Sequence, residues 1–238
     1  MTVQLNDETE LRGRSVILAT GARYRDLGLP DQDSFRGVGV YYAATELEAR
    51  RCRDGDVVVV GGGNSAGQAA MFLSRTCGTV HLVCRGPNLQ RSMSQYLVSR
   101  LEYTSNVRIH TDCTIFEIRG GERLEAATIL HSQGDRTQVP ACGLFAMIGA
   151  DPGTDWLRET VDLDDKGFIL TGADAATPGE PVPTPFQTSR AGVFAIGDVR
   201  SGSVKRVASA VGEGSVVVQA IHRYLTEGQV ADRVGLPV

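Results

Sequence analysis

A glycine-rich hexapeptide, GGGNSA at residues 61–66, has the spacing of a loop that binds phosphate groups. Its GxGxxA pattern is formed by Gly61, Gly63 and Ala66. The first glycine permits a tight turn, the second lets the backbone approach a pyrophosphate, and the small third residue lets a helix pack closely on a strand. Free N–H groups and the positive end of the helix dipole attract the phosphates. We therefore expect a dinucleotide to contact the whole loop: Gly61, Gly62, Gly63, Asn64, Ser65 and Ala66.

The sequence on both sides of this loop supports that interpretation. The apolar run at 57–60 is typical of a short strand buried on both faces of a parallel sheet. Residues 64–76 follow with apolar residues at helical spacing. A glycine turn with a purely structural role is the alternative, but a glycine pattern between an apolar strand and a helix is the context that indicates dinucleotide binding.

The end of the next strand, expected at 79–84, indicates which dinucleotide fits. An NAD site usually has an acidic residue about 20 positions after the glycines, which binds the ribose hydroxyls. This strand ends in Cys84, Arg85 and Gly86 and has no acid. The planar guanidinium of Arg85, helped by Arg91, can pair with a 2′-phosphate, so NADPH is favoured. The alternative is a solvated arginine at a strand end.

Two further turns follow predicted strands, ATGA at 19–22 and GVFAIGD at 192–198. Each strand ends in a sharp glycine turn. Taken alone, Asp198 could equally cap a helix or occupy an ordinary turn. The pair becomes informative together with the glycine loop that lies between them in the sequence.

The order of the predicted elements indicates an α/β fold that contains a doubly wound nucleotide-binding unit. Residues 56–150 alternate between strand and helix and then become mostly strand. The remaining expected elements are an N-terminal hairpin, helices at 44–52 and 91–102, strands at 106–111, 122–132 and 142–149, a short KGFIL strand at 166–170, and a final helix from near Arg206 to about Thr226.

The composition disfavours several classes of partner. The 238 residues carry a net charge of −4 without a basic cluster, which argues against nucleic acid or an anionic membrane. The longest apolar runs are too short to cross a bilayer. The histidines are dispersed, and the HxxC of His110 and Cys113 is too little for a metal site. The five cysteines are scattered and form no CxxC, as expected in a reducing cytoplasm.

The order ATG…GGGNSA…MIGADPGT…GVFAIGD…AVGEG resembles the pyridine nucleotide–disulfide oxidoreductase superfamily, and within it the thioredoxin reductase-like flavoproteins. The resemblance extends from about residue 10 to residue 226. It implies two Rossmann-like units, with an NAD(P)H-binding domain at 41–150 inserted into an incomplete FAD-binding domain formed by 1–40 and 151–238.

The same resemblance implies residues that bind FAD. Asp198 takes the place of the aspartate that binds the ribityl chain, and Arg206 and Val207 would lie near flavin N1 and O2, at a helix N-terminus that stabilises the reduced ring. The other residues that the resemblance places at the cofactors are Thr20, Gly21, Ile148, Gly149, Gly197 and Ala208.

The sequence departs from the family in two places. No GxGxxG precedes residue 61, so we expect an N-terminally incomplete chain that binds FAD poorly when expressed alone. The redox CxxC of thioredoxin reductases is replaced by Ala43, Ala44, Thr45 and Glu46, and Cys52 is expected to be a single thiol. Tyr41 and Tyr42 beside this segment could form a lid near the flavin or simply a domain hinge.

These features predict an FAD-dependent, NADPH-oxidising oxidoreductase without catalytic side chains of its own. The electron acceptor could be ferredoxin, flavodoxin, a thioredoxin-like protein, a quinone or oxygen, and the sequence does not choose among them. It also leaves open whether the protein forms a homodimer. The alternatives are a thioredoxin-disulfide reductase, as overall similarity would suggest, and a non-catalytic NADP(H)-binding or redox-sensing module.

Overall fold

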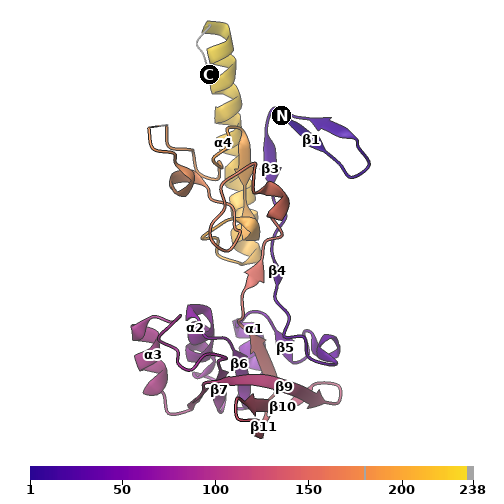
Figure 1. The fold of residues 1–238 in the computed structure, drawn as a ribbon, viewed down its shortest axis with the longest axis vertical. Coiled ribbons are helices and arrows are strands. Elements are labelled where there is room, and N and C mark those ends of the chain that lie inside the picture. Colours follow the sequence, from indigo (N-terminus) through magenta and orange to yellow (C-terminus); the bar gives the residue numbers. More distant parts are fainter. Residues whose placement is uncertain (180, 235–238) are drawn as a thin grey trace. The chain divides into compact units, whose positions relative to one another are not determined.

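The computed structural model describes residues 1–179 and 181–234, and the chain divides into two compact units. The first, here called the terminal unit, combines Met1–Arg23 with Ala150–Val238. The second, the central unit, is Tyr24–Gly149. Figure 1 follows the chain through both units by colour.

The central unit begins at Tyr24 rather than near residue 41, where the sequence placed a boundary. Phe35, on the short 3-10 helix η1 (Gln32–Phe35), and Val40 are both buried in the core of this unit and hold the preceding segment to it. Two short strands pair with each other: β4 (Arg23–Tyr24) and β13 (Ala150–Asp151).

Five parallel strands form the sheet of the central unit, in the order β5-β12-β6-β7-β8. All four residues of β6, β7 and β12 are buried, which accounts for their nearly continuous apolar sequences. The strand bounds are β5 (Val40–Tyr41), β6 (Val57–Val60), β7 (Val80–Val83), β8 (Val107–His110) and β12 (Gly143–Ala146).

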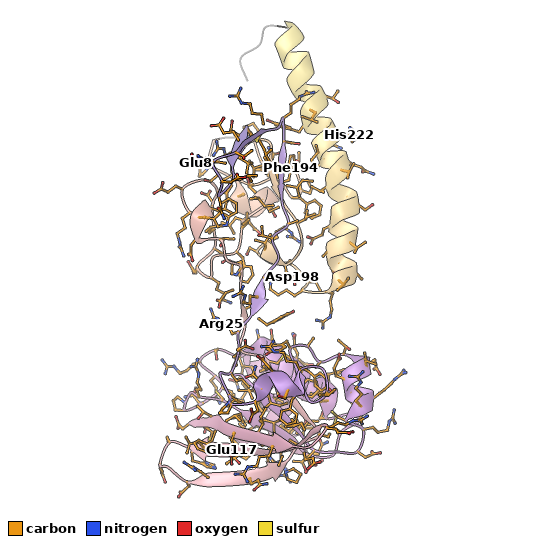
Figure 2. All side chains as sticks on the ribbon, turned by 90° about the vertical axis from the view of Figure 1, so that its right-hand side faces the viewer. Glu8, Arg25, Glu117, Phe194, Asp198 and His222 are labelled. Carbon is orange, nitrogen blue, oxygen red and sulfur yellow. The ribbon has the colours of Figure 1, made fainter. Side chains whose placement is uncertain are left out.

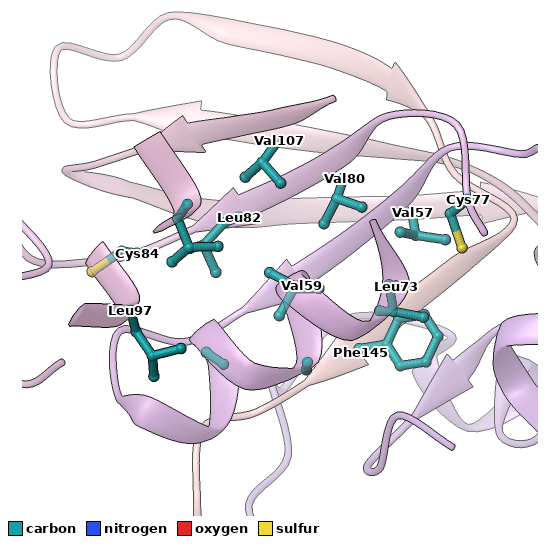
Figure 3. Packing of buried hydrophobic residues seen from close by; sticks show 14 of the residues in the cluster. Val57, Val59, Leu73, Cys77, Val80, Leu82, Cys84, Leu97, Val107 and Phe145 are labelled. Carbon is teal, nitrogen blue, oxygen red and sulfur yellow. The ribbon is translucent and has the colours of Figure 1, made fainter. Parts of the chain in front are cut away.

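Helices α1 (Glu46–Arg51), α2 (Asn64–Leu73) and α3 (Gln95–Glu102) contribute to one core cluster with this sheet. Figure 3 shows Leu73 of α2 and Leu97 of α3 against the strand residues of that core. Helix α3 begins at Gln95 and not at residue 91, because residues just before it bond to the glycine loop, as described below.

An antiparallel three-stranded sheet contributes to the second core cluster of the central unit. Its order is β11-β10-β9, and Ile129 of β10 is fully buried in the same cluster as Leu144 of β12. The parallel sheet is therefore packed with helices in one cluster and with a second sheet in the other. The bounds are β9 (Cys113–Gly120), β10 (Leu124–His131) and β11 (Arg136–Pro140).

The terminal unit is built around a parallel pair of strands and a long helix. Strands β3 (Val16–Leu18) and β14 (Val193–Ala195) pair in parallel, and α4 spans Val207–Val234. Figure 2 shows Phe194 and Asp198 in the same unit as this helix. The other elements are the hairpin β1 (Thr2–Gln4) and β2 (Glu10–Arg12) and the 3-10 helices η2 (Asp155–Leu157), η3 (Gly172–Ala175) and η4 (Gly197–Val199).

Two expectations for the terminal unit were wrong in detail. Within residues 166–170 only Ile169 forms bridges, to Leu163 and to Arg200, because Gly167, at φ 87°, lies in a tight turn just before it. Helix α4 continues beyond Thr226, whose hydroxyl donates to the carbonyl of His222 and so stays within the helical pattern.

Within the described residues, no helix is long and apolar enough to cross a membrane.

Candidate functional site

The glycine loop lies at the carboxyl edge of the parallel sheet, between the ends of β7 and β12. The Gly61 N–H donates to the carbonyl of Val83 at 2.9 Å, and the Met147 N–H donates to the carbonyl of Val60 at 2.8 Å. Gly61 has φ 149°, and a Cβ there would lie 2.4 Å from the Met147 oxygen and 3.0 Å from the Cβ of Ala66. The first and last positions of GxGxxA must therefore both be small.

Helix α2 starts directly after this turn and presents backbone donors. Its N-cap is Gly63, with φ −95°, and no side chain caps it by a hydrogen bond. A Cβ on Gly63 would come no closer than 3.7 Å to the Ser92 carbonyl oxygen, so the space over this glycine is open. Asn64 and Ser65 of the first turn are exposed. Uncapped N–H groups at the positive end of a helix suit a phosphate.

The two arginines expected at a 2′-phosphate follow β7 at the same edge. Arg85 comes directly after Cys84, whose Sγ lies 2.8 Å from where a Cβ on Gly62 would be. Both Arg85 and Arg91 are exposed, and neither has a hydrogen bond or ion pair within the described chain. Their charges are thus available to a ligand.

Ile148 and Gly149 lie at this edge too, just after β12. Ile148 is half-buried against the second core cluster, and the Gly149 carbonyl accepts from the Arg25 N–H at 3.0 Å. The structure therefore brings together all the residues of the central unit that the sequence assigned to a cofactor.

In the terminal unit, ATGA and GVFAIGD also come together. Ile17 pairs with Phe194 in register, and the Ile196 N–H donates to the Leu18 carbonyl at 3.1 Å, so the two glycine turns leave the same edge of the pair. Gly21 and Gly197 both take left-handed φ angles, 72° and 71°. Thr20 is exposed beside Gly21.

Asp198 is half-buried next to the start of α4. The Gly197 N–H donates to a Glu213 oxygen of α4 at 2.6 Å, which ties this turn to the helix. Glu213 also accepts from Arg200 at 2.5 Å. Burial lowers the pKa of Lys205, while Asp198 acts in the opposite direction, so these two charges are near each other.

The residues expected at the flavin ring stand at the beginning of α4. Arg206 precedes the helix, and Val207 and Ala208 form its first turn. All three are exposed, with Val207 at 83%. The start of α4 is thus open to solvent in the terminal unit.

The segment that the resemblance places at the family's redox pair is the capped start of α1. Thr45 is the N-cap, its hydroxyl accepts from the Leu47 N–H at 3.3 Å, and Glu48 accepts from the Thr45 N–H at 3.0 Å. Ala43 and Glu46 provide no thiol at this place. The residues of this segment therefore cap the helix.

Cys52 is not a single thiol, as its sequence position had suggested. It is fully buried at the end of α1, and Cys142 lies beside it although 90 residues separate them. The contact between the two thiols, together with burial, raises the pKa of Cys52, and the same contact lowers the pKa of Cys142. The sequence carries no local signal for this pair.

This thiol pair lies at the amino edge of the sheet, away from the glycine loop. The Cys142 thiol donates to the carbonyl of Asp56 at 3.2 Å, just before β6, whereas the glycines follow the other end of β6. Four strand residues at ~3.3 Å each separate the two places by roughly 13 Å. Figure 3 shows the two ends of the sheet, marked by Cys77 and Cys84. The pair therefore lies at the opposite edge of the sheet from the glycine loop.

The two tyrosines before α1 are engaged within the central unit. The Tyr42 hydroxyl donates to Asp26 and accepts from Gln32 at 2.8 Å, and Arg36 lies 5.3 Å over its ring. Tyr41 is buried against Phe145, with ring centroids 5.2 Å apart. These contacts hold both tyrosines inside the central unit, so they support neither the lid nor the domain hinge.

Sequence reasoning missed one part of the site, the contact of residues 92–94 with the glycine loop. The Ser92 hydroxyl donates to the Gly62 carbonyl at 2.9 Å, and the Ser94 N–H donates to Asn64 Oδ1 at 2.7 Å. Two serines within three residues after Arg91, just before a helix, were the available signal. No cluster of metal-binding side chains occurs among the described residues.

Comparison with known proteins gives one consistent family. A family model described as pyridine nucleotide-disulphide oxidoreductase matches residues 1–214. A thioredoxin reductase of Streptomyces clavuligerus is 31% identical over 237 residues, which cover 99% of this chain and 70% of that protein. A thioredoxin reductase of Mycolicibacterium smegmatis is 32% identical over 227 residues, 95% of this chain and 68% of that protein. The crystal structure of thioredoxin reductase from Streptococcus pyogenes MGAS5005 superposes with a TM-score of 0.79 at 30% identity, over 94% of this chain and 69% of that one.

Proposed function

The chain belongs to the pyridine nucleotide-disulphide oxidoreductase family, and we propose that this thioredoxin reductase-like oxidoreductase uses NADPH and FAD without a protein disulfide. The absence of thiols at Ala43 and Glu46 is the observation that carries the proposal. Bound together, NADPH would supply a hydride and FAD would accept it. The protein's part is to bind, orient and polarise these cofactors.

The glycine loop fits the diphosphate of NADPH. The open face of Gly63 and the uncapped start of α2 supply N–H donors, and a ligand phosphate would satisfy them. Arg85 and Arg91 would pair with the 2′-phosphate, because they are exposed and lack protein partners among the described residues. We therefore assign the NAD(P)H site to the central unit.

The terminal unit has features that fit part of an FAD site. Gly21 allows close approach of a ligand to the backbone, and the Asp198 carboxylate is held next to α4 by the bond from Gly197 to Glu213. The first turn of α4, with Val207 and Ala208, would place a positive dipole end toward a flavin ring. These contacts support the assignment of Thr20, Gly197 and Arg206 to the same cofactor.

We propose that electrons leave the flavin directly for an external acceptor such as ferredoxin, flavodoxin or a quinone. Thioredoxin reduction through an internal dithiol would require cysteines at the start of α1, where Thr45 and Glu48 form a capping box instead. The Cys52–Cys142 pair sits at the wrong edge of the sheet for that role.

The test compares acceptors with the purified chain supplied with FAD. NADPH oxidation should proceed with a small quinone and should not respond to added thioredoxin with insulin. A matched variant, Cys52→Ser with Cys142→Ser, should behave like the parent chain. Thioredoxin-dependent turnover that this double variant abolishes would overturn the proposal.

A second candidate function is an NADP(H)-binding module without catalysis. The central unit is well packed, since it has two core clusters of its own. The strand pair of the terminal unit is less completely covered, since Ile17 is 43% exposed. This difference favours a function that needs the central unit alone. The visible spectrum of the purified chain separates the two functions. Flavin bands support the oxidoreductase, whereas NADP⁺ binding without them supports the module.

We also propose that the protein resides in the cytoplasm, since all five cysteines are free thiols.

For the quaternary structure, we propose a homodimer. Light scattering of the purified chain tests it, and a mass equal to that of one chain would contradict it.

A further inference from the structure

The loop that carries Arg91 forms two hydrogen bonds with the glycine loop. The Ser92 hydroxyl donates to the Gly62 carbonyl at 2.9 Å, directly after the arginine. Two residues further on, the Ser94 N–H donates to Asn64 Oδ1 at 2.7 Å. Both acceptors belong to the segment that would hold the diphosphate, so the arginine loop and the diphosphate loop form one connected structure.

Apolar packing restricts the backbone of this loop on both sides of Arg91. Leu89 and Met93, on either side of Arg91, are 3% and 5% exposed. Met93 occupies the space over Gly67 of α2, where a Cβ would lie 2.7 Å from the methionine sulfur. A side chain between two anchored neighbours has a restricted range of positions, and a guanidinium needs a defined position for a bidentate contact.

We propose that Ser92 and Asn64 are positioning residues that hold Arg91 at the 2′-phosphate and thereby set the preference for NADPH over NADH. The inference rests on the proposed NADPH site. Without the Ser92 hydroxyl, Gly62 loses a bond partner and the loop is held by Asn64 and by packing alone. Arg91 then has more freedom, and the ordering cost on binding the 2′-phosphate increases.

The test measures dissociation constants by calorimetry for NADP⁺ and NAD⁺ with the full chain. One net hydrogen bond corresponds to about threefold to tenfold in affinity. Ser92→Ala should weaken NADP⁺ binding by that factor and leave NAD⁺ binding within about twofold. Ser92→Thr keeps the hydroxyl and should restore the parent value. Ser105→Ala is the matched control, since Ser105 is an exposed serine before β8, outside this loop.

A double-mutant cycle with Arg91→Ala isolates the link between the two residues. In the Arg91→Ala chain, adding Ser92→Ala should not weaken NADP⁺ binding further. Equal losses for both nucleotides, or additive losses in the cycle, would overturn the positioning role. If the parent chain binds NADP⁺ more tightly than NAD⁺ and Ser92→Ala has the same NADP⁺ affinity as the parent, only this inference is refuted. If the parent chain does not bind NADP⁺, the proposed function is refuted as well. Thermal denaturation of each variant shows that it is folded.

Discussion

Two glycines of the same loop have different physical roles. Gly61 is required by the protein itself, because its φ of 149° and the Met147 oxygen leave no room for a Cβ. Gly63 has an ordinary φ of −95° and open space around it. Only a ligand would need a glycine at the second position.

Alanine substitutions should separate these roles. Gly61→Ala should lower the free energy of unfolding by roughly 2–5 kcal/mol, through backbone strain and the clash with Met147. Gly63→Ala should leave stability nearly unchanged and yet weaken NADP⁺ binding, since its methyl group would stand where the diphosphate approaches. Urea denaturation and calorimetry measure the two effects, and a destabilised Gly63→Ala protein with normal NADP⁺ affinity would contradict this division.

Residue patterns predicted the glycine loop well, because strand, turn and helix are neighbours in the sequence and each leaves a local signal. They could not predict the contact of Cys52 with Cys142, which arises because β12 lies between β5 and β6. They also missed the bond from Ser92 to Gly62, since a hydroxyl in a polar loop looks the same whether it is solvated or bonded to the backbone.

At the scale of elements, three strands place histidines near one another. His81 of β7 and His110 of β8 lie with Nδ1 and Nε2 3.0 Å apart, and His131 of β10 meets His110 edge-on. Burial, together with the positive charge that the neighbouring histidines can carry, lowers the pKa of His110 from 6.5 to about 4. The sheet therefore holds this histidine neutral.

A neutral histidine of this kind makes stability depend on pH. Because the folded pKa lies below the unfolded one, its contribution is complete above pH 6.5 and is lost as the pH falls towards about 4. We expect the unfolding free energy to fall from pH 7 to pH 5, and to fall less in His110→Gln. His222→Gln, exposed on α4 (Figure 2), is the matched control. An NMR titration that places the His110 pKa above 6.5 would refute this.

Strand and helix predictions failed where long-range contacts decide the conformation. Residues 166–170 have strand-like composition, yet Ile169 makes isolated bridges on both sides rather than a ladder. Helix α3 was placed too early because residues 91–94 have helical spacing, while their polar groups bond to the glycine loop. In both cases a tertiary hydrogen bond competes successfully with a local preference.

At the scale of the whole molecule, each unit has its own hydrophobic core. The central unit has two buried clusters, and a third, which includes Leu18, Ile169 and Val193, belongs to the terminal unit. The single tryptophan of the sequence, Trp156, is in the terminal unit. Its fluorescence therefore reports on that unit alone.

Separate cores predict separate responses to the two cofactors. NADP⁺ at a hundredfold excess over its Kd should stabilise the central unit by ~2.7 kcal/mol. The thermal transition seen by circular dichroism should then shift upward while that of Trp156 fluorescence stays in place. FAD should shift the Trp156 transition once its concentration exceeds the high Kd expected for this chain. A single transition that both cofactors move equally would show that the units unfold together.

The proposed function requires that electrons pass through the flavin and not through a protein disulfide. An anaerobic titration of the FAD-loaded chain with NADPH, followed by the visible flavin absorption, tests it most directly. Without a redox pair at Ala43 and Glu46, one NADPH per flavin should bleach the absorption completely. A requirement for two equivalents would reveal a disulfide that takes up the second electron pair, and would contradict the account.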